Sequence, residues 1–280
     1  MVSSRIVFGN CTNMEEVLDG SVQLIVTSPP YYNAPFDYPN LFKNYEEFTH
    51  MIKGVAKELF RVLEQGRIAC FVTDDMLVDG QKFPIVADIT KIMIETGFRY
   101  RDKIVWVKPK GYTRISRRSG LVLQHPYPMY FYPDNIQESV LIFQKGKFDY
   151  DYVKNLPKKV KDTSRIDTKE YNGKEWNLSV WNITNVLPKE GRLEEGIAAF
   201  PEEIPSRFIK LFTFAGETVL DPFAGSATTL KTAMQLGRMG IGYELDLGLQ
   251  KVMVKKLKGY NVKFVRRRDA KNLRNSSLTV

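Results

Sequence analysis

The chain contains few of the residues that build disulfide frameworks or zinc sites. Its 280 residues include two cysteines, Cys11 and Cys70, and two histidines, His50 and His125. The cysteines stand far apart and outside any C-x-x-C pair, so the sequence predicts neither a disulfide scaffold nor a Cys/His metal site. No apolar run approaches the ~18 residues that a membrane helix needs, and residues 1–10 lack the apolar centre of a signal peptide. These absences predict a soluble, cytoplasmic protein with neither a metal nor a membrane partner.

Two common nucleotide-binding patterns are also missing. The sequence contains neither G-x-G-x-x-G, which is typical of dinucleotide-binding folds, nor the phosphate-binding loop G-x-x-x-x-G-K-[ST]. Both patterns place backbone N–H groups around phosphates, so their absence disfavours a nicotinamide-dependent dehydrogenase and a nucleoside triphosphatase.

Positive charge is in excess and is concentrated in two segments. The chain carries 41 Lys and Arg against 32 Asp and Glu, a formal charge of +9, with an ordinary 43% of hydrophobic residues. Residues 99–118 hold eight basic residues and one acid, and residues 251–274 hold ten basic residues and one acid. Such runs can be solvated faces, but two of them in one chain favour a partner that carries phosphates.

Short apolar strands alternate along the chain with longer amphipathic helices. The pattern predicts strands at 22–27, 67–73, 103–107, 139–144, 218–220 and 240–243, and helices at 45–64, 84–95, 202–214, 228–236 and 247–257. This alternation predicts an α/β fold with a mostly parallel sheet and helices on both faces. Residues 145–185 are polar and weakly periodic, which indicates an insertion, and residues 266–280 are predicted to form a basic, frayed tail.

A proline-rich turn follows the first of these strands. Thr27-Ser28-Pro29-Pro30-Tyr31-Tyr32 ends the strand, because proline cannot continue a central ladder. The turn leaves the Ser28 hydroxyl and the Ser28 and Pro29 carbonyls able to accept hydrogen bonds beside the Tyr31 ring. Oxygen acceptors next to an aromatic face suit a planar ligand with an exocyclic amino group. An ordinary packed loop is the alternative.

Two further strand ends predict a cofactor pocket. The segment 219–229, VLDPFAGSATT, runs from a strand into a helix, with Asp221 at the strand end and Gly225 where a ligand can approach the backbone. The helix N-terminus offers N–H groups to a carboxylate, and Asp221 can meet an ammonium group. Glu244 follows the next strand, where acids commonly bind ribose hydroxyls. An adenosine that carries an amino acid, as in S-adenosylmethionine, fits these groups.

The motifs resemble those of DNA amino-methyltransferases. T-S-P-P-Y at 27–31 and L-D-P-F-A-G-S-A-T-T at 220–229 are similar to the family's catalytic and cofactor motifs, and their order resembles the β-group. Residues 199–205 and 240–246 are also similar to family segments, so the resemblance covers the chain outside 146–185. Ser28 stands where adenine enzymes typically carry Asp and is typical of the N4-cytosine enzymes of restriction-modification systems.

The resemblance implies a Rossmann-like methyltransferase fold, S-adenosylmethionine as cofactor and double-stranded DNA as substrate. It further implies a prokaryotic cytoplasmic enzyme that a cognate restriction endonuclease accompanies. The catalytic residues it implies are Ser28, Pro29, Pro30 and Tyr31. The cofactor-binding residues are Asn10, Thr27, Asp221, Phe223, Gly225, Ser226, Thr228 and Glu244. The chain departs from the family at Ala227, where a second glycine is usual, and at Asn10, where aspartate is usual.

The reaction implied is direct methyl transfer to the N4 amine of a cytosine flipped out of the duplex. Neither cysteine has the Pro-Cys context of a C5-cytosine enzyme, so C5 methylation is disfavoured. The alternatives are an N6-adenine enzyme, because the Ser/Asp distinction does not strictly determine the base, and an inactive DNA-binding subunit of a restriction-modification complex. Intact Ser28, Tyr31, Gly225 and Glu244 disfavour the second alternative.

DNA contacts are expected mainly between the two motif-bearing parts of the chain. The candidates are Lys108, Lys110, Arg114, Arg117, Arg118 and Gln124. The predicted division is a catalytic part at 1–108, a strand hairpin with the target-recognition region at 109–200 (variable at about 146–185), a cofactor-binding part at 201–265 and the tail at 266–280. Trp176 and Trp181 are expected in the core or at a hinge, and His125 in a loop.

Overall fold

The computed structural model describes residues 4–34, 40–109, 127–129, 133, 135–184, 200–271 and 273. Within these residues, nine strands form one sheet in the order β11-β1-β10-β9-β2-β3-β7-β6-β8. The strands are β1 Ser4–Phe8, β2 Val22–Thr27, β3 Leu63–Thr73, β6 Arg99–Val107, β7 Gln137–Gln144, β8 Val180–Asn182, β9 Thr218–Asp221, β10 Met239–Glu244 and β11 Val262–Arg266. Strand β7 is antiparallel to β3 and β6, and the other neighbouring pairs of this sheet are parallel. The predicted α/β class is confirmed.

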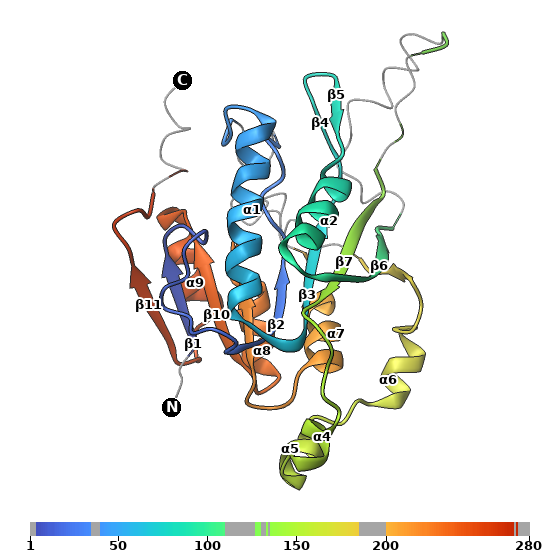
Figure 1. Cartoon of the computed structure of the whole chain (residues 1–280), viewed down its shortest axis with the longest axis vertical. Coiled ribbons are helices and arrows are strands. Elements are labelled where there is room, and N and C mark those ends of the chain that lie inside the picture. Colours follow the sequence, from blue (N-terminus) through green and yellow to red (C-terminus); the bar gives the residue numbers. More distant parts are fainter. Residues whose placement is uncertain are drawn as a thin grey trace.

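Helices cover both faces of the sheet, as Figure 1 shows. On one face lie α1 Tyr45–Val62 and α2 Ile85–Thr96, and on the other α7 Glu203–Phe212, α8 Thr228–Gln235 and α9 Gln250–Lys256. Strand β2 has apolar side chains on both faces, because helices cover both sides of the sheet. Ile25 packs in the core beneath α1 and α2, whereas Leu24 and Val26 pack in the core that contains α7. A strand between two helical layers therefore reads as a continuous apolar run.

Helix α1 forms where the sequence predicts it but ends earlier. Asn44 caps its N-terminus by accepting a hydrogen bond from the Glu47 amide (2.8 Å). The helix ends at Val62 and β3 begins at the next residue, so Gly66 lies inside a strand and does not end the helix. Gly66 has φ +84°, and a Cβ there would meet the Phe148 backbone at 2.5 Å. Glycine is required at this position because the insertion passes so close to it.

The insertion carries more regular structure than its composition indicates. It contains the short helices α4 Asp151–Asn155, α5 Lys158–Thr163 and α6 Thr168–Gly173. Arg67, within β3, anchors it: the guanidinium lies 5.1 Å from the Phe148 ring centroid and 5.0 Å from that of Tyr152. Arg67 also pairs with Glu217 at 2.5 Å, and Tyr152 donates to the same carboxylate (3.0 Å). One buried ion pair thus connects the insertion to β3 and to the residue that precedes β9.

Three strands of the sheet were not predicted from the sequence. Strands β1 and β11 pair with each other beside β10, and β8 adds to the opposite edge next to β6. Nor was a separate hairpin predicted after β3, where β4 Met76–Val78 pairs with β5 Gln81–Phe83. Each of these strands except β1 and β11 has only three residues, which is too short for a periodic pattern to emerge.

The start of the predicted tail is also structured. Arg266 ends β11, and the Arg267 guanidinium bonds Glu16. Residues 266–271 are therefore not a frayed tail, because β-pairing and this ion pair hold them. Trp176 and Trp181 lie in the core, at 4% and 2% exposure.

Candidate active site

The two motifs meet where the strand order of the sheet reverses. From β2 the chain passes through α1 to β3 on one side, and from β9 through α8 to β10 on the other. Because β2 and β9 are parallel neighbours, their carboxyl ends open into the same crevice, which is where ligands bind in such sheets. Thr27 Oγ1 donates to Asp221 Oδ1 (2.6 Å), so a buried hydrogen bond joins motifs that are 194 residues apart.

Asp221 accepts hydrogen bonds from three groups of the protein. In addition to Thr27, the Thr229 hydroxyl donates to Oδ2 (2.7 Å) and the Phe223 amide to Oδ1 (3.1 Å). Burial raises the pKa of Asp221 to about 6, although these three donors oppose the shift. Only 2% of the residue is exposed. The structure therefore uses Asp221 to join the two strand ends, and its contact with a cofactor ammonium stays a prediction.

Glu244 places a second carboxylate at the end of β10. Its Oε2 accepts the Gly225 amide and its Oε1 the Asp246 amide, both at 2.9 Å. Burial raises the pKa of Glu244 to about 7, against the two amide bonds, which lower it. Each carboxylate oxygen has a second lone pair, so Glu244 retains capacity for further donors such as hydroxyls. Its bond to Gly225 also fixes the loop that leads into α8.

The loop before α8 has a strained residue and an unexpected cation. Ala227 adopts φ +66° and ψ +33°, the left-handed region that glycine favours. The Lys256 ammonium, from α9, donates to Ser226 Oγ (2.8 Å) and to Thr228 Oγ1 (2.7 Å). Both hydroxyl residues are buried, at 2% and 6% exposure. Ser226 and Thr228 therefore direct their hydroxyls to Lys256, a contact that no local motif indicates.

Asn10 lies beside the same strand end. The Gly9 amide donates to the Glu244 carbonyl (2.8 Å), which brings the Gly9-Asn10 turn next to β10. Asn10 itself is exposed, with its Oδ1 accepting the Thr12 amide and its own backbone amide donating to Asp269, both at 2.9 Å. The side-chain nitrogen of this exposed asparagine can donate to a ligand.

The proline-rich turn lies on the other side of the crevice. Pro29 is buried, whereas Ser28, Pro30 and Tyr31 are partly exposed. The Tyr31 hydroxyl donates to Glu138 Oε2 (2.7 Å), from β7. Burial, together with the Glu138 charge, raises the pKa of Tyr31 well above its usual range, while the Ser28 side chain beside it acts in the opposite direction. Tyr31 therefore stays protonated next to Ser28.

Of the six predicted DNA-binding residues, the structure describes one, Lys108. Lys108 forms an ion pair with Glu138 and is 21% exposed, so it is not a free surface cation. The other five candidates lie outside the described residues, as does His125: Lys110, Arg114, Arg117, Arg118 and Gln124.

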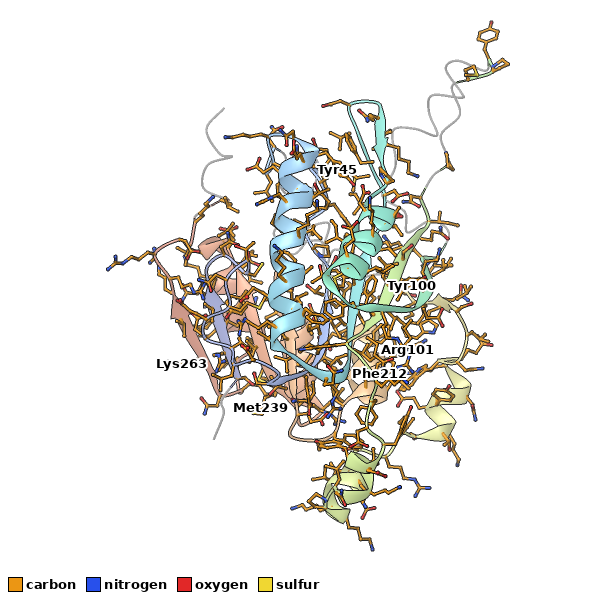
Figure 2. All side chains as sticks on the ribbon, in the orientation of Figure 1. Tyr45, Tyr100, Arg101, Phe212, Met239 and Lys263 are labelled. Atoms are coloured by element: carbon orange, nitrogen blue, oxygen red, sulfur yellow. The ribbon has the colours of Figure 1, made fainter. Side chains whose placement is uncertain are left out.

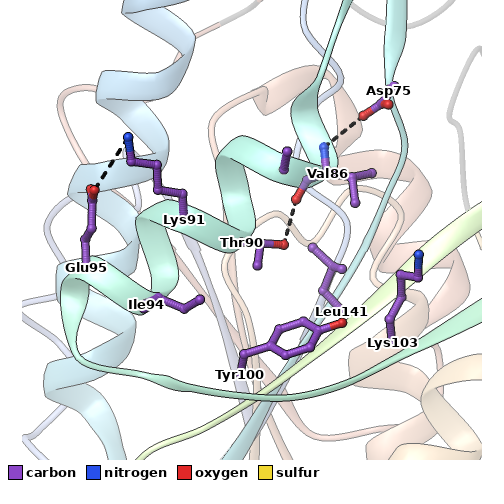
Figure 3. A pocket seen from close by; sticks show the side chains of 10 residues that line it. Asp75, Val86, Thr90, Lys91, Ile94, Glu95, Tyr100, Lys103 and Leu141 are labelled. Carbon is purple, nitrogen blue, oxygen red and sulfur yellow. Dashed lines mark hydrogen bonds and ion pairs between the residues drawn. The ribbon is translucent and has the colours of Figure 1, made fainter.

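Two hollows lie outside this crevice. A groove of about 730 Å³ runs beside α2, between Thr90, Ile94 and Tyr100 (Figure 3). A pocket of about 290 Å³ lies near the insertion, where Arg101 sits over the Phe212 ring (5.6 Å; Figure 2). Neither is lined by a residue of the two motifs.

Among the described residues, no helix is long and apolar enough to cross a membrane, and no three acidic, His or Cys side chains gather as a metal site would require.

Comparisons with known proteins agree with this geometry. A family model described as DNA methylase (N6_N4_Mtase) matches residues 22–255. The type II methyltransferase M.MjaI of Methanocaldococcus jannaschii is 31% identical, over 94% of this chain and 96% of its own.

Solved structures show the same architecture. A putative DNA modification methylase from Thermus thermophilus has a TM-score of 0.72 and 25% identity, covering 94% of this chain and 100% of its own, and has also been solved in complex with S-adenosyl-L-methionine. PvuII DNA methyltransferase (cytosine-N4-specific) shares the fold, with a TM-score of 0.61 and 17% identity over 94% of this chain and 96% of its own. These matches confirm the Rossmann-like methyltransferase fold. With a family model matched over most of its length and a relative similar nearly end to end, the chain belongs to the DNA methylase family of N6-adenine and N4-cytosine methyltransferases.

Proposed function

We propose that the protein transfers a methyl group from S-adenosylmethionine to the exocyclic N4 of cytosine in double-stranded DNA. The observation that carries the proposal is the placement of Ser28. It follows β2 directly, one residue from the Thr27–Asp221 hydrogen bond that joins the turn to the cofactor loop. An amine held by Ser28 therefore lies beside whatever the cofactor loop binds.

The residues around the crevice fit S-adenosylmethionine. Glu244 accepts the ribose hydroxyls, because its carboxylate is buried at a strand end and keeps free lone pairs. Phe223, partly exposed beside Asp221, supplies an apolar surface, and Asn10 donates to the adenine. The amides after Gly225, at the start of α8, receive the carboxylate. Thr27, Asp221, Ser226 and Thr228 support these contacts by holding the loop.

Direct transfer assigns distinct tasks to the turn. S-Adenosylmethionine supplies a methyl group activated by a sulfonium; the transfer breaks the methyl C–S bond, leaves S-adenosylhomocysteine and releases one proton from the amine. The Ser28 hydroxyl and the Pro29 carbonyl accept hydrogen bonds from the amine and stabilise the positive charge that develops on its nitrogen. The two prolines hold these acceptors in place, and Tyr31 provides a face on which the flipped base stacks. Alignment of the nitrogen with the methyl group provides much of the rate enhancement.

Target recognition falls to the remaining parts of the chain. We assign the reading of the DNA sequence to residues 109–200, with Arg114, Arg117, Arg118 and Gln124 near bases and Lys110 near phosphates. The name of the M.MjaI relative favours a restriction-modification role, with a cognate endonuclease as the cellular counterpart.

Nucleoside analysis tests the proposal. The protein is incubated with methyl-labelled S-adenosylmethionine and unmethylated DNA, and the digested nucleosides are separated with mass detection. Label in N4-methylcytosine is expected; label in 6-methyladenine would instead establish the N6-adenine alternative, and label in 5-methylcytosine would exclude direct transfer to an amine. If wild-type protein binds the cofactor and DNA but labels no DNA, the inactive subunit is favoured. Ser28→Ala is the matched control, expected to lose turnover while keeping cofactor affinity.

A further inference from the structure

Tyr31, in the proline-rich turn, is hydrogen-bonded to an ion pair that Glu138 of β7 forms with Lys108, the residue after β6. Tyr31 follows β2 and donates its hydroxyl to Glu138 Oε2 (2.7 Å). Glu138 is the second residue of β7, and its other oxygen, Oε1, pairs with the Lys108 ammonium, just after β6. The Glu138 side chain is only 15% exposed, so this pair is partly withdrawn from solvent. One carboxylate thus connects the turn to the antiparallel half of the sheet.

The sheet register builds this pair and fixes its position. Trp106 of β6 lies opposite Glu138 of β7, and the Lys108 amide continues the ladder by donating to the Ile136 carbonyl (2.8 Å). Because side chains alternate along a strand, Trp106 and Lys108 lie on the same face, where both can reach Glu138. The Lys108 ammonium also lies 5.1 Å from the Trp106 ring centroid. The ion pair is therefore part of the sheet rather than an encounter between two mobile surface chains.

The arrangement holds the Tyr31 ring at both ends. At the backbone end, two prolines restrict the chain that carries it. At the hydroxyl end, the phenol remains protonated, because burial and the Glu138 charge raise the pKa of Tyr31, and it can only donate to Glu138. The Lys108 ammonium pairs with the other oxygen of Glu138, so the carboxylate that accepts the Tyr31 hydroxyl is itself held in place. A ring held in this way cannot swing into the space that an extrahelical base needs beside Ser28.

We propose that Glu138 is a positioning residue that sets the orientation of Tyr31 for the target base, with Lys108 holding Glu138. The inference rests on the proposed function, since it assumes that a base enters beside Ser28. It gives Lys108 a task different from the phosphate contact that its sequence context predicts. Neither Glu138 nor Lys108 needs to touch the reacting atoms for this role.

A double-mutant cycle tests the coupling. Tyr31→Phe removes only the hydroxyl, and Glu138→Ala removes its acceptor. We expect each variant to lower kcat on unmethylated plasmid DNA by about tenfold or more, with the Kd for S-adenosylmethionine unchanged. The double variant should be no slower than the slower single one, because both remove the same contact. Glu138→Gln, which keeps an acceptor oxygen, should recover part of the activity. Gln137→Ala, one residue along β7 and exposed, is the control for disturbance of the strand.

Lys108→Met separates the two roles of this lysine. A positioning role predicts a lower kcat with the slope of log DNA affinity against log salt unchanged, whereas a phosphate contact predicts a slope smaller by about one unit. Fully multiplicative losses in the Tyr31 and Glu138 cycle, or wild-type kcat in Glu138→Ala, would overturn the inference. These outcomes require an active wild-type enzyme. They therefore differ from failure of the proposed function, in which wild-type protein methylates no DNA or labels a base other than cytosine at N4.

Discussion

A proton on Glu244 links the stability of the protein to the proposed binding of the cofactor ribose. Burial raises the pKa of this carboxyl to about 7 from an ordinary 4.5. A carboxyl whose pKa is higher in the folded state keeps its proton better when folded, so the free energy of unfolding falls as pH rises from 4.5 to 7. The full loss from Glu244 is about 3 kcal/mol, at 1.36 kcal/mol per pKa unit.

Replacing Glu244 with glutamine isolates this effect. Both carboxylate oxygens accept a backbone amide, from Gly225 and Asp246, so the glutamine amide loses one of these bonds at every pH. That cost is constant and cancels from the pH dependence. Urea unfolding of both proteins between pH 5 and pH 8 should therefore show that wild type loses up to about 3 kcal/mol more than Glu244→Gln as pH rises. Parallel stability curves for the two proteins would refute the reasoning.

The affinity for S-adenosylmethionine should depend on pH in the opposite direction, increasing as pH rises. In the proposed complex the ribose hydroxyls donate to the ionised carboxylate, so binding of S-adenosylmethionine competes with protonation of Glu244. Calorimetric titration of wild type should give a Kd about tenfold weaker at pH 6 than at pH 8. The Glu244→Gln variant should bind more weakly throughout and lose most of this pH dependence.

Three further changes test the loop, the insertion and the DNA contacts. Ala227→Val should lower the free energy of unfolding by more than about 2 kcal/mol, because a β-branched residue at φ +66° is strained and the site is fully buried. In the same urea assay, the free energy of unfolding of Ala227→Gly should stay within about 1 kcal/mol of the wild-type value. Arg67→Met should cost about 3–5 kcal/mol by leaving Glu217 buried without its partner, and replacing Glu217 with Leu in the same protein should recover part of this loss. Replacing both Arg117 and Arg118 with Ala should weaken DNA binding; if both contact phosphates, the slope of log affinity against log salt falls by about two units, whereas an unchanged slope contradicts phosphate contact.

The central part of the sheet could be predicted because its sequence pattern is strong and local. Strand β2 is an uninterrupted apolar run that two prolines end, and α1 repeats its buried residues at helical spacing. Strand β8 could not be predicted in this way, because it has only three residues and forms by pairing with β6. Strand β1 likewise depends on partners more than 200 residues away, at Ile241 and Val262.

In the site, too, the continuous motifs could be predicted from the sequence, whereas the distant residues that contact them could not. The turn at Ser28 and the loop at Gly225 are continuous motifs, so the sequence could name them as candidates. The partners of their side chains come from distant segments: Glu138 lies 107 residues from Tyr31, and Lys256 lies 30 residues from Ser226. Only the tertiary structure brings these charges to the motifs, and it also shows that Asp221 is enclosed. A motif identifies which residues form a site but not which of their atoms remain available.

The interleaving of the first and last strands has a consequence for biosynthesis. Strand β1 lies between β10 and β11, and β2 lies between β3 and β9, which begins at Thr218. At about 5–20 residues per second, the ribosome therefore needs on the order of ten seconds or longer after β2 to complete β9, and the edge of β2 that pairs with β9 stays open during this time. During this time an apolar strand with an open edge is available for aggregation or for a chaperone. The crevice can form only when nearly the whole chain has left the ribosome, so a truncated product has no partial activity and folding ends with slow, long-range strand pairing.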